Sequence, residues 1–518
     1  MTITKYPIPV IDLFAGPGGL SEGFSSYEEG STFCVRLSIE KDRFAHRTLE
    51  LRAFFRSFDE DPPSEYYNYL KHQISREELF KMFPTQANKA RNQAWQAELG
   101  NRKYPKAQVD KKIRTALGRH GDRWVLIGGP PCQAYSLIGR SRIKGKSIKD
   151  YESDNRHFLY RQYLKILAEH KPPVFVMENV KGLLSTEIND QRIVEHILRD
   201  LRNPSQAVRN SSKHNGAEYV LHCLAPTKKQ YTELTPEDFI VKSEAYGIPQ
   251  TRHRIILLGI RADVRVKPKH LIPQESTLSV EQAIGDVPPV RSGISRMIDS
   301  YERWLAVVRS ITRSEWLKEG AVTKEIRGAI KAVAESQNLA FSRGGEFVKT
   351  VAAPQIMAEW FRDTRLRGVC NHSTRRHMES DLHRYLFASA YAQVNGHSPR
   401  LIDFPKGLLP DHANVGDAIR DRKFGDRFHV QVSNRPASTV TAHICKDGHY
   451  FIHYDSKQCR SLTVREVARL QTFPDNYFFE GPRTEQYRQV GNAVPPLLAI
   501  QIADIVAGIF YQAGNQKA

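Results

Sequence analysis

Short apolar runs that stop at glycine, proline or a polar side chain recur along the first half of the chain. Residues 7–13 read PIPVIDL and run into the glycine-rich turn FAGPGG, and residues 124–127 (WVLI) stop at the sequence GGPP. Apolar runs without alternation are typical of strands that helices cover on both faces. The pattern predicts an α/β sheet with functional loops at the carboxyl ends of its strands.

Three further apolar runs adjoin charged or amide side chains. Such groups are costly to bury at a strand end unless they meet a partner or a polar ligand. The runs are residues 33–40, which end in Glu40, residues 172–177, which lead into Glu178 and Asn179, and residues 255–260, which follow Gln250, Arg252 and Arg254.

The rest of the chain has helical or irregular patterns. Residues 51–121 are rich in charge, so we predict a helical insertion outside the sheet, on the side of the core that carries the turn FAGPGG. Strand rhythm is also lost over residues 261–430 and returns at 435–442. Thr463 and Glu466 have the spacing of a capping box. Helices are predicted at residues 77–83, 86–99, 158–169, 300–310, 324–336, 462–470 and after Pro496 to about Phe510.

Length, charge and cysteine usage narrow the class of protein. A chain of 518 residues has room for about two or three domains. Its formal charge of +19 predicts a polyanionic partner, with nucleic acid favoured over an anionic membrane surface. No apolar run approaches membrane-spanning length and no signal peptide is evident, so we expect a soluble, cytoplasmic protein. Six cysteines without CxxC pairs favour reduced thiols.

Cys132 stands directly after Pro130 and Pro131, which fix two backbone φ angles. A thiol on such a stiff turn is positioned to act as a nucleophile, although a structural cysteine beside a proline turn fits the same residues. Glu178 also follows an apolar strand, and this similar placement suggests that the two groups share a pocket. The basic, glycine-flanked loop 139–146 that follows could close over a substrate and contact phosphates, or be an ordinary surface loop.

The turn FAGPGG between a strand and a helix is an arrangement that binds an adenosyl cofactor. Gly16, Gly18 and Gly19 allow a ligand to approach the backbone closely. Glu40 follows about 20 residues later, where an acid can bond ribose hydroxyls, although it could also be a solvated carboxylate.

The segment Cys370 to His377 has two interpretations. Cys370, His372 and His377 could bind zinc, but paired ligand spacing is missing, so we expect no metal site. We favour a helix start that contacts a nucleic-acid backbone.

Six motifs resemble those of the DNA (cytosine-5) methyltransferase family, in the family's order. They are DLFAGPGG at 12–19, GGPPCQAYS at 128–136, MENV at 177–180, QTRHR at 250–254, RPASTVTA at 435–442 and GNAVPP at 491–496. The resemblance implies a doubly wound, Rossmann-like α/β fold that uses S-adenosyl-L-methionine. The family's acidic motif for the adenine amino group is not evident, and Asp59 and Asp61 are weak candidates for it.

The resemblance also implies the chemistry. Cys132 would add to C6 of a flipped cytosine, which activates C5 for methylation. Glu178 would hydrogen-bond or protonate ring N3, and Arg254 would stabilise the developing charge, with Arg252 and Gln250 supporting the loops. No metal is required.

Other site residues follow from the same resemblance and from the charge pattern. The expected cofactor contacts are Phe14, Ala15, Gly16, Gly18, Gly19, Leu20, Glu40, Pro131, Leu159, Asn492 and Val494. The expected substrate contacts are Gln133, Ser136, Arg140, Arg142, Asn179, Gln250, Arg375, Arg376 and Thr439.

We therefore expect a catalytic domain built from residues 1–275 and 431–518, with a target-recognition domain at 276–430. The last helix should return to pack beside the first strand. The expected partner is double-stranded DNA, with a restriction or phage-defence system alongside a monomeric enzyme. Three alternatives are a transfer-RNA cytosine-5 methyltransferase, a catalytically silent DNA-binding subunit and a dinucleotide oxidoreductase. The large variable region between the motifs QTRHR and RPASTVTA disfavours the transfer-RNA enzyme. The presence of Cys132, Glu178 and Arg254 disfavours the silent subunit. Cys132 together with the motif GNAVPP disfavours the oxidoreductase.

Overall fold

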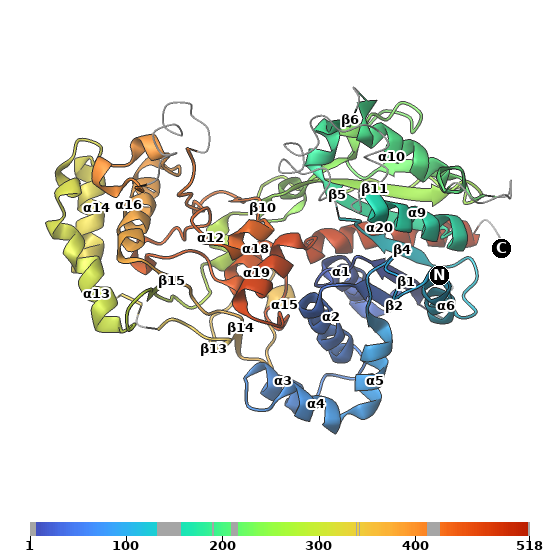
Figure 1. Cartoon of the computed structure of the whole chain (residues 1–518), viewed down its shortest axis with the longest axis horizontal. Coiled ribbons are helices and arrows are strands. Elements are labelled where there is room, and N and C mark those ends of the chain that lie inside the picture. The colour runs from blue at the N-terminus through green and yellow to red at the C-terminus, as the bar shows by residue number, and fades with distance from the viewer. Residues whose placement is uncertain are drawn as a thin grey trace.

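The computed structural model describes residues 7–131, 157–188, 191–208, 216–337, 339–340, 342–411 and 425–515. An eight-stranded sheet forms its largest element, in the order β3-β2-β1-β4-β5-β11-β8, and β9 also pairs with β11 (Figure 1). The five strands from β3 to β5 run parallel, whereas β11 runs antiparallel to its three partners. The strands are β1 Ile8–Leu13, β2 Phe33–Glu40, β3 Ala94–Gln96, β4 Val125–Gly128, β5 Val174–Val180, β8 Tyr219–Cys223, β9 Ile240–Lys242 and β11 His253–Arg261.

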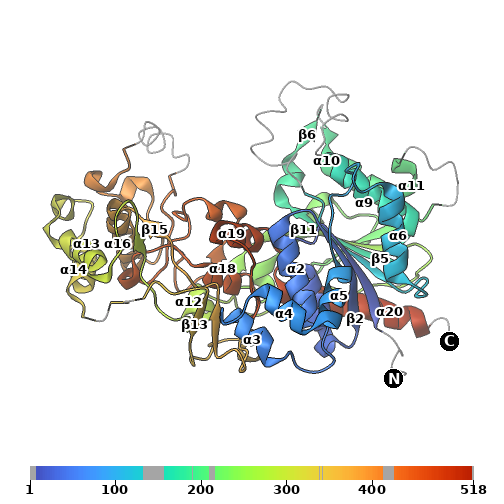
Figure 2. The same cartoon turned by 60° about the horizontal axis from the view of Figure 1, so that its bottom comes forward.

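Helices cover both faces of the sheet, which confirms the predicted doubly wound α/β class. Along β4, Val125 and Ile127 face one core and Leu126 faces the other, as side chains alternate across a strand. The first core contains α1 (Gly19–Ser26) and α20 (Pro496–Asn515). The second contains α6 (Lys106–Leu117), α9 (His157–His170) and α10 (Ile193–Arg202), so α20 and α6 lie on opposite sides of the strands (Figure 2).

The last helix, α20, shares its core with Ile8 and Val10 of β1, so the expected return of the chain to the first strand is confirmed. Among the described residues, only this region has a helix long and apolar enough to cross a membrane, and 67% of the apolar window is buried inside the protein. The prediction that no apolar run approaches that length is therefore wrong. Burial against α1 and the sheet accounts for the apolar composition.

The prediction that residues 51–121 lie outside the sheet is wrong for part of the segment. Strand β3 pairs in parallel with the edge of β2, and α6 covers one face of the sheet. The helices between α2 (Arg43–Phe55) and β3 form a separate aromatic cluster with α2; they are α3 (Ser64–Leu70), α4 (Arg76–Met82) and α5 (Pro84–Gln93). Leu366 and Phe478, from distant parts of the chain, complete this cluster.

The remaining chain forms two further cores beside the sheet. The outer one, at the far left of Figure 1, contains α13 (Tyr301–Ser310), α14 (Lys324–Glu335) and α16 (Glu379–Asn395). The inner one packs α12 (Val280–Ile284) against α18 (Val464–Leu470) and α19 (Arg483–Asn492). Ile452 and Cys459 pack in the outer core, so residues on both sides of position 430 contribute to it. The predicted domain limits stay a prediction.

Most predicted helices are present within a few residues, and the capping box of Thr463 and Glu466 is confirmed. The strand predicted at 435–442 is wrong in extent. Only β16 (Ala437–Ser438) forms there, paired with β10 (Gln250–Thr251), because the following residues serve as hydrogen-bond partners for side chains from other segments.

Candidate active site

The turn between β1 and α1 is compact and partly open. Phe14 and Gly16 have φ near 56°, and Gly18 has a φ of 96°, a region that favours glycine. The Ala15 amide donates to the Ile39 carbonyl at 3.2 Å, which ties the turn to β2. A Cβ on Gly19 would lie 2.1 Å from the Val494 carbonyl oxygen, so only glycine permits this contact with the C-terminal segment.

Two acids flank this turn. Glu40, at the end of β2, accepts hydrogen bonds of 2.8 Å from the amides of Gly16 and Asp42, and burial raises its pKa. Asp12, at the end of β1, is only 1% exposed, and neither of its carboxylate oxygens has a well-formed hydrogen bond. Burial raises the pKa of Asp12 to about 8. An underused buried acid beside an open turn suits a ligand that brings hydrogen-bond donors or positive charge.

The other expected cofactor contacts differ in burial and in the elements that carry them. Leu20 and Val494 are buried in the core shared by α1 and α20. Asn492 is the exposed last residue of α19, Pro131 is half-buried just after β4, and Leu159 is half-buried on α9. The Tyr477 hydroxyl donates to the Pro17 carbonyl and supports the turn from behind. Their contact with a cofactor stays a prediction.

Glu178 and Arg254 lie on neighbouring strands and form an ion pair. Glu178 Oε1 is 3.0 Å from Arg254 Nε, and both side chains are about 15% exposed, at 15% and 14% respectively. A Cβ on Gly129 would fall 2.7 Å from the Glu178 carbonyl oxygen and 3.1 Å from Oε2. The end of β4 therefore approaches the Glu178 side chain closely. Cys132, Gln133, Ser136, Arg140 and Arg142 lie outside the described residues.

Arg252 and Gln250 are buried supports rather than open contacts. Arg252 is 1% exposed and donates to the carbonyls of Val440 and Gly491 at 2.8 and 3.4 Å. Burial, with the positive charge of Arg254 nearby, lowers the pKa of Arg252 well below its ordinary value. Gln250 is fully buried and accepts from the Val440 amide. The structure thus gives both residues the supporting role, and the expected substrate contact of Gln250 is replaced by contacts within the protein.

Of the other expected substrate contacts, Asn179, Thr439 and Arg375 form hydrogen bonds within the protein, and Arg376 is exposed. Asn179 is 5% exposed and its Oδ1 accepts from the Val180 amide at 2.7 Å, while the Thr439 hydroxyl donates to the Thr251 carbonyl at 2.6 Å. Arg375 donates to the carbonyls of residues 444–446 and lies 4.1 Å from the Tyr487 ring centroid. The structure therefore gives Arg375 an internal role in place of a phosphate contact. Arg376 is exposed, and its contact with DNA stays a prediction.

Glu98 is an acid that the sequence pattern did not single out. Gln96 of β3 pairs with Glu40, and the Ala97 amide donates to the Glu40 carbonyl at 3.0 Å. Glu98 therefore follows β3 at the sheet edge where Glu40 lies. Asp61, by contrast, lies between α2 and α3, where it pairs with Arg365 at 3.3 Å. An acid two residues after a short edge strand is the sequence feature that could have identified Glu98. The strand was not recognised because we predicted a single helix over residues 86–99.

His372 has no ring nitrogen left for a metal. Its Nε2 lies 2.8 Å from the Pro288 carbonyl and its Nδ1 lies 2.8 Å from the Thr463 hydroxyl. Among the described residues, no cluster of histidine, cysteine and acidic side chains could hold a metal ion. The His372 contacts instead tie the variable region to the start of α18.

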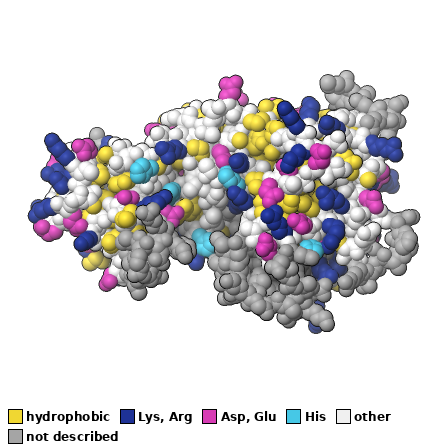
Figure 3. All heavy atoms as spheres, turned by 90° about the horizontal axis from the view of Figure 1, so that it is seen from above, with side chains coloured by type: hydrophobic (Ala, Val, Ile, Leu, Met, Phe, Trp, Pro, Cys, Tyr) yellow, Lys and Arg dark blue, Asp and Glu magenta, His cyan; other side chains and the backbone are white. Residues whose placement is uncertain are grey.

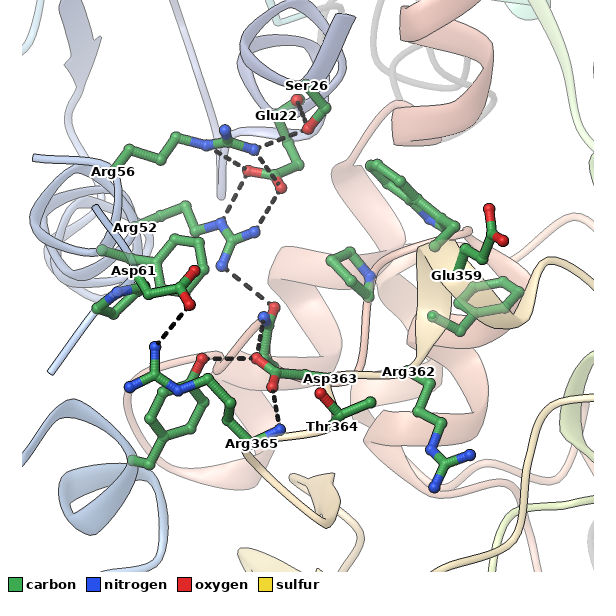
Figure 4. A pocket seen from close by; sticks show the side chains of 17 residues that line it. Glu22, Ser26, Arg52, Arg56, Asp61, Glu359, Arg362, Asp363, Thr364 and Arg365 are labelled. Carbon is green, nitrogen blue, oxygen red and sulfur yellow. Dashed lines mark hydrogen bonds and ion pairs between the residues drawn. The ribbon is translucent and has the colours of Figure 1, made fainter. Parts of the chain in front are cut away.

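A pocket of about 350 Å³ lies apart from the expected site residues, between α1, α2 and α15 (Ala358–Phe361) (Figure 4). Three of its four acids, Glu22, Asp61 and Asp363, have partners, whereas Glu359 is exposed. Glu22 binds Arg52 at 2.6 Å and Arg56 at 2.7 Å, and Asp363 accepts from Tyr67 and Asn476. Because most of its buried charges are paired within the protein, we interpret the pocket as a boundary where three segments of the chain meet.

The chain is similar in sequence to DNA methyltransferases. A family model described as C-5 cytosine-specific DNA methylase matches residues 78–205 and 235–507. The Type II methyltransferase M.Bpa9945I of Bacillus paralicheniformis is 31% identical, covering 96% of this chain and 98% of that protein. The Type II methyltransferase M.DdeI of Desulfomicrobium norvegicum is 25% identical, covering 97% and 89%. The DNA (cytosine-5-)-methyltransferase M.ApeKI of Aeropyrum pernix is 26% identical, covering 75% and 82%. The chain belongs to the C-5 cytosine-specific DNA methylase family and is a DNA (cytosine-5-)-methyltransferase.

Proposed function

We propose that this enzyme transfers a methyl group from S-adenosyl-L-methionine to C5 of a flipped cytosine within a specific duplex DNA sequence, through a covalent bond between Cys132 and C6. The observation that carries the proposal is the order of three adjacent parallel strands, β1-β4-β5. Their carboxyl ends bring the glycine turn, the segment that leads to Cys132, and Glu178 to one edge of the sheet.

The cofactor would lie on the glycine turn. S-adenosyl-L-methionine supplies an electrophilic methyl group when bound. Glu40 would bond ribose hydroxyls, and Glu98, which follows the strand paired with Glu40, would accept from the adenine amino group. The underused carboxyl group of Asp12 fits the donors of the cofactor's α-amino group.

The protein residues would divide the chemistry among them. The Cys132 thiolate forms a bond to C6, and electron density moves toward ring N3, where Glu178 shares a proton. Arg254 stabilises the negative charge that develops on the ring. C5 then forms a bond to the methyl carbon while the bond between that carbon and the cofactor sulfur breaks, and S-adenosyl-L-homocysteine leaves. A solvent base removes the C5 proton, the C5–H electron pair forms the C5–C6 double bond, and the C6–S bond breaks to release the Cys132 thiolate.

A DNA substrate rather than transfer RNA is favoured by the family match and by the large region between β11 and β16. Lys and Arg side chains are spread over the face seen in Figure 3 rather than gathered in one field. We propose that the enzyme acts on cytoplasmic DNA as the modification half of a restriction or phage-defence system, with the variable region reading base edges.

Methyl transfer from labelled S-adenosyl-L-methionine to duplex DNA and to transfer RNA tests this function directly. We expect label in DNA alone, and bisulfite sequencing of DNA from a host that expresses the protein should locate protected cytosines in one short sequence. Label in transfer RNA alone would contradict the proposed substrate. Protected cytosines without a common sequence would contradict the proposed specificity.

A further inference from the structure

Three arginines from distant segments come together where the variable region meets α19. Arg376 lies on β15 (Arg376–His377), which pairs with β12 (Gly293–Ile294) and sets Gly293 opposite Arg376. Arg343 lies over Gly293, where a Cβ would come within 2.6 Å of its Cζ atom. Arg343 and Arg483, the first residue of α19, both donate to one acceptor, the Thr374 carbonyl, at 2.9 and 2.5 Å.

This arginine cluster, Arg343, Arg376 and Arg483, has many donors and few acceptors. Asp299 lies 3.7 Å from Arg343 but already holds Arg291 through two bonds of 3.0 and 3.1 Å. The Nε atom of Arg343 is buried without a hydrogen-bond partner. Within the described ranges, the exposed Arg376 forms no hydrogen bond or ion pair. Each guanidinium offers five N–H donors, so most of the donors in the cluster are unused by the protein.

Like charges at this spacing oppose one another. Burial lowers the pKa of Arg343, Asp299 opposes the shift, and Arg376 and Arg483 add to it. An anion bound among the three guanidiniums would relieve that repulsion. The adjacent Arg375 is different, because three backbone carbonyls and an aromatic ring occupy its guanidinium.

We propose that Arg343, Arg376 and Arg483 bind a phosphodiester group of the DNA backbone, an inference that rests on the proposed function. Guanidinium groups bind phosphate oxygens through paired, charge-assisted hydrogen bonds. Phosphate contacts carry no sequence information, but they fix the register of a protein on its duplex. Because the cluster joins β15 to α19, one phosphate here would hold the variable region and the C-terminal part against the same DNA strand.

Salt-dependent DNA binding tests the cluster. Dissociation constants for a target duplex and an unrelated duplex are measured over a range of NaCl concentrations by fluorescence anisotropy. The variants are Arg376→Ala and the double variant Arg376→Ala with Arg483→Ala. Arg309→Ala is the matched control, because Arg309 is an exposed arginine on α13 outside the cluster. Loss of one phosphate contact should reduce the log–log salt slope by about one. We expect that change for the double variant on both duplexes and none for the control.

Three further measurements make the result decisive. S-adenosyl-L-methionine binding by calorimetry and the thermal transition should match the wild type in each variant, and wild-type methyl transfer to DNA is measured in parallel. An unchanged slope in the folded double variant would overturn the phosphate site while the proposed function stands. A loss confined to the target duplex would overturn it too, because that pattern indicates base contacts. If the wild type neither binds nor methylates DNA, the proposed function fails instead, and the inference falls with it.

Discussion

Glu178 of β5 and Arg254 of β11 form a diagonal ion pair across two antiparallel strands, with 3.0 Å between Glu178 Oε1 and Arg254 Nε. Arg254 also donates from Nη1 to the His253 carbonyl at 2.9 Å, so its guanidinium is held from two sides. Preorganised charge of this kind requires no rearrangement when negative charge develops on a substrate.

Arg254→Lys should therefore lower kcat by about 100-fold or more, the typical loss when one charge-stabilising donor is removed. Lysine keeps the charge but lacks the planar, forked donors. Single-turnover methyl transfer measures the effect. Arg261→Lys, at the other end of the same strand, is the matched control. Equal rates for the wild type and Arg254→Lys would exclude a role for Arg254 in the chemical step.

Cys132→Ser should abolish methyl transfer while DNA and cofactor binding persist. The hydroxyl has a far higher pKa than the thiol and supplies almost no nucleophilic anion, although its size preserves the loop. Cys34→Ser, which changes a half-buried thiol on β2, should keep full activity. Near-normal turnover by Cys132→Ser would rule out the covalent mechanism.

A duplex with 5-fluorocytosine at the target position should trap the enzyme as an adduct that survives denaturant. Fluorine at C5 blocks the final proton loss, so the C6–S bond cannot break. Denaturing gel electrophoresis with and without S-adenosyl-L-methionine detects the shifted band, which should require the cofactor. A confirmed target sequence that yields no stable adduct would count against attack at C6.

Asp12→Asn should stabilise the apoprotein increasingly as pH rises. The folded pKa of Asp12 is raised to about 8 from an ordinary value of 3.8. Between these values the folded state keeps a proton that the unfolded state releases, so the wild type loses stability as pH rises through this window. Asparagine does not titrate. Thermal melts from pH 4 to pH 8 should show a growing advantage for the variant, and exposed Asp59→Asn should show none. A constant difference would contradict the assigned titration.

Exchange of residues 290–430 for the same region of another family member should change which cytosines are modified while cofactor binding survives. Ile452 and Cys459 share the outer core with this region, so a second chimera extended to residue 461 controls for lost packing. Bisulfite sequencing identifies the modified cytosines. An unchanged pattern from a folded, active chimera would place specificity elsewhere, for instance in residues 51–121.

The central strands were predictable because each lies within a long apolar run. The proximity of Arg254 to Glu178 was implied by the family resemblance and not by the apolar pattern. The edge strand β3 was not predictable, since three residues carry no periodicity and the preceding helix α5 masks them. Glu98 was missed for the same reason. Its place near Glu40 depends on strand pairing rather than on any local pattern.

The sequence also did not predict whether a long side chain points into the protein or toward solvent. Arg375 and Arg376 are neighbours with the same charge, yet one is bound by carbonyls of residues 444–446 and the other is exposed. The resemblance implied a supporting role for Gln250 and Arg252, and a substrate contact for Gln250 as well, but it did not say which backbone they support. The backbone at Val440 that they hold lies 190 and 188 positions away along the chain.

The position of α20 bears on how the protein is synthesised. The face of β1 and β4 that contains Ile8, Val10 and Ile127 is covered in part by α20, which is synthesised after every strand of the sheet. Until α20 is made, the part of this apolar face that α1 does not cover is exposed, and such surfaces favour aggregation. A stop codon shortly before α20 should therefore give an insoluble product that chaperones retain and proteases remove, rather than a weak enzyme.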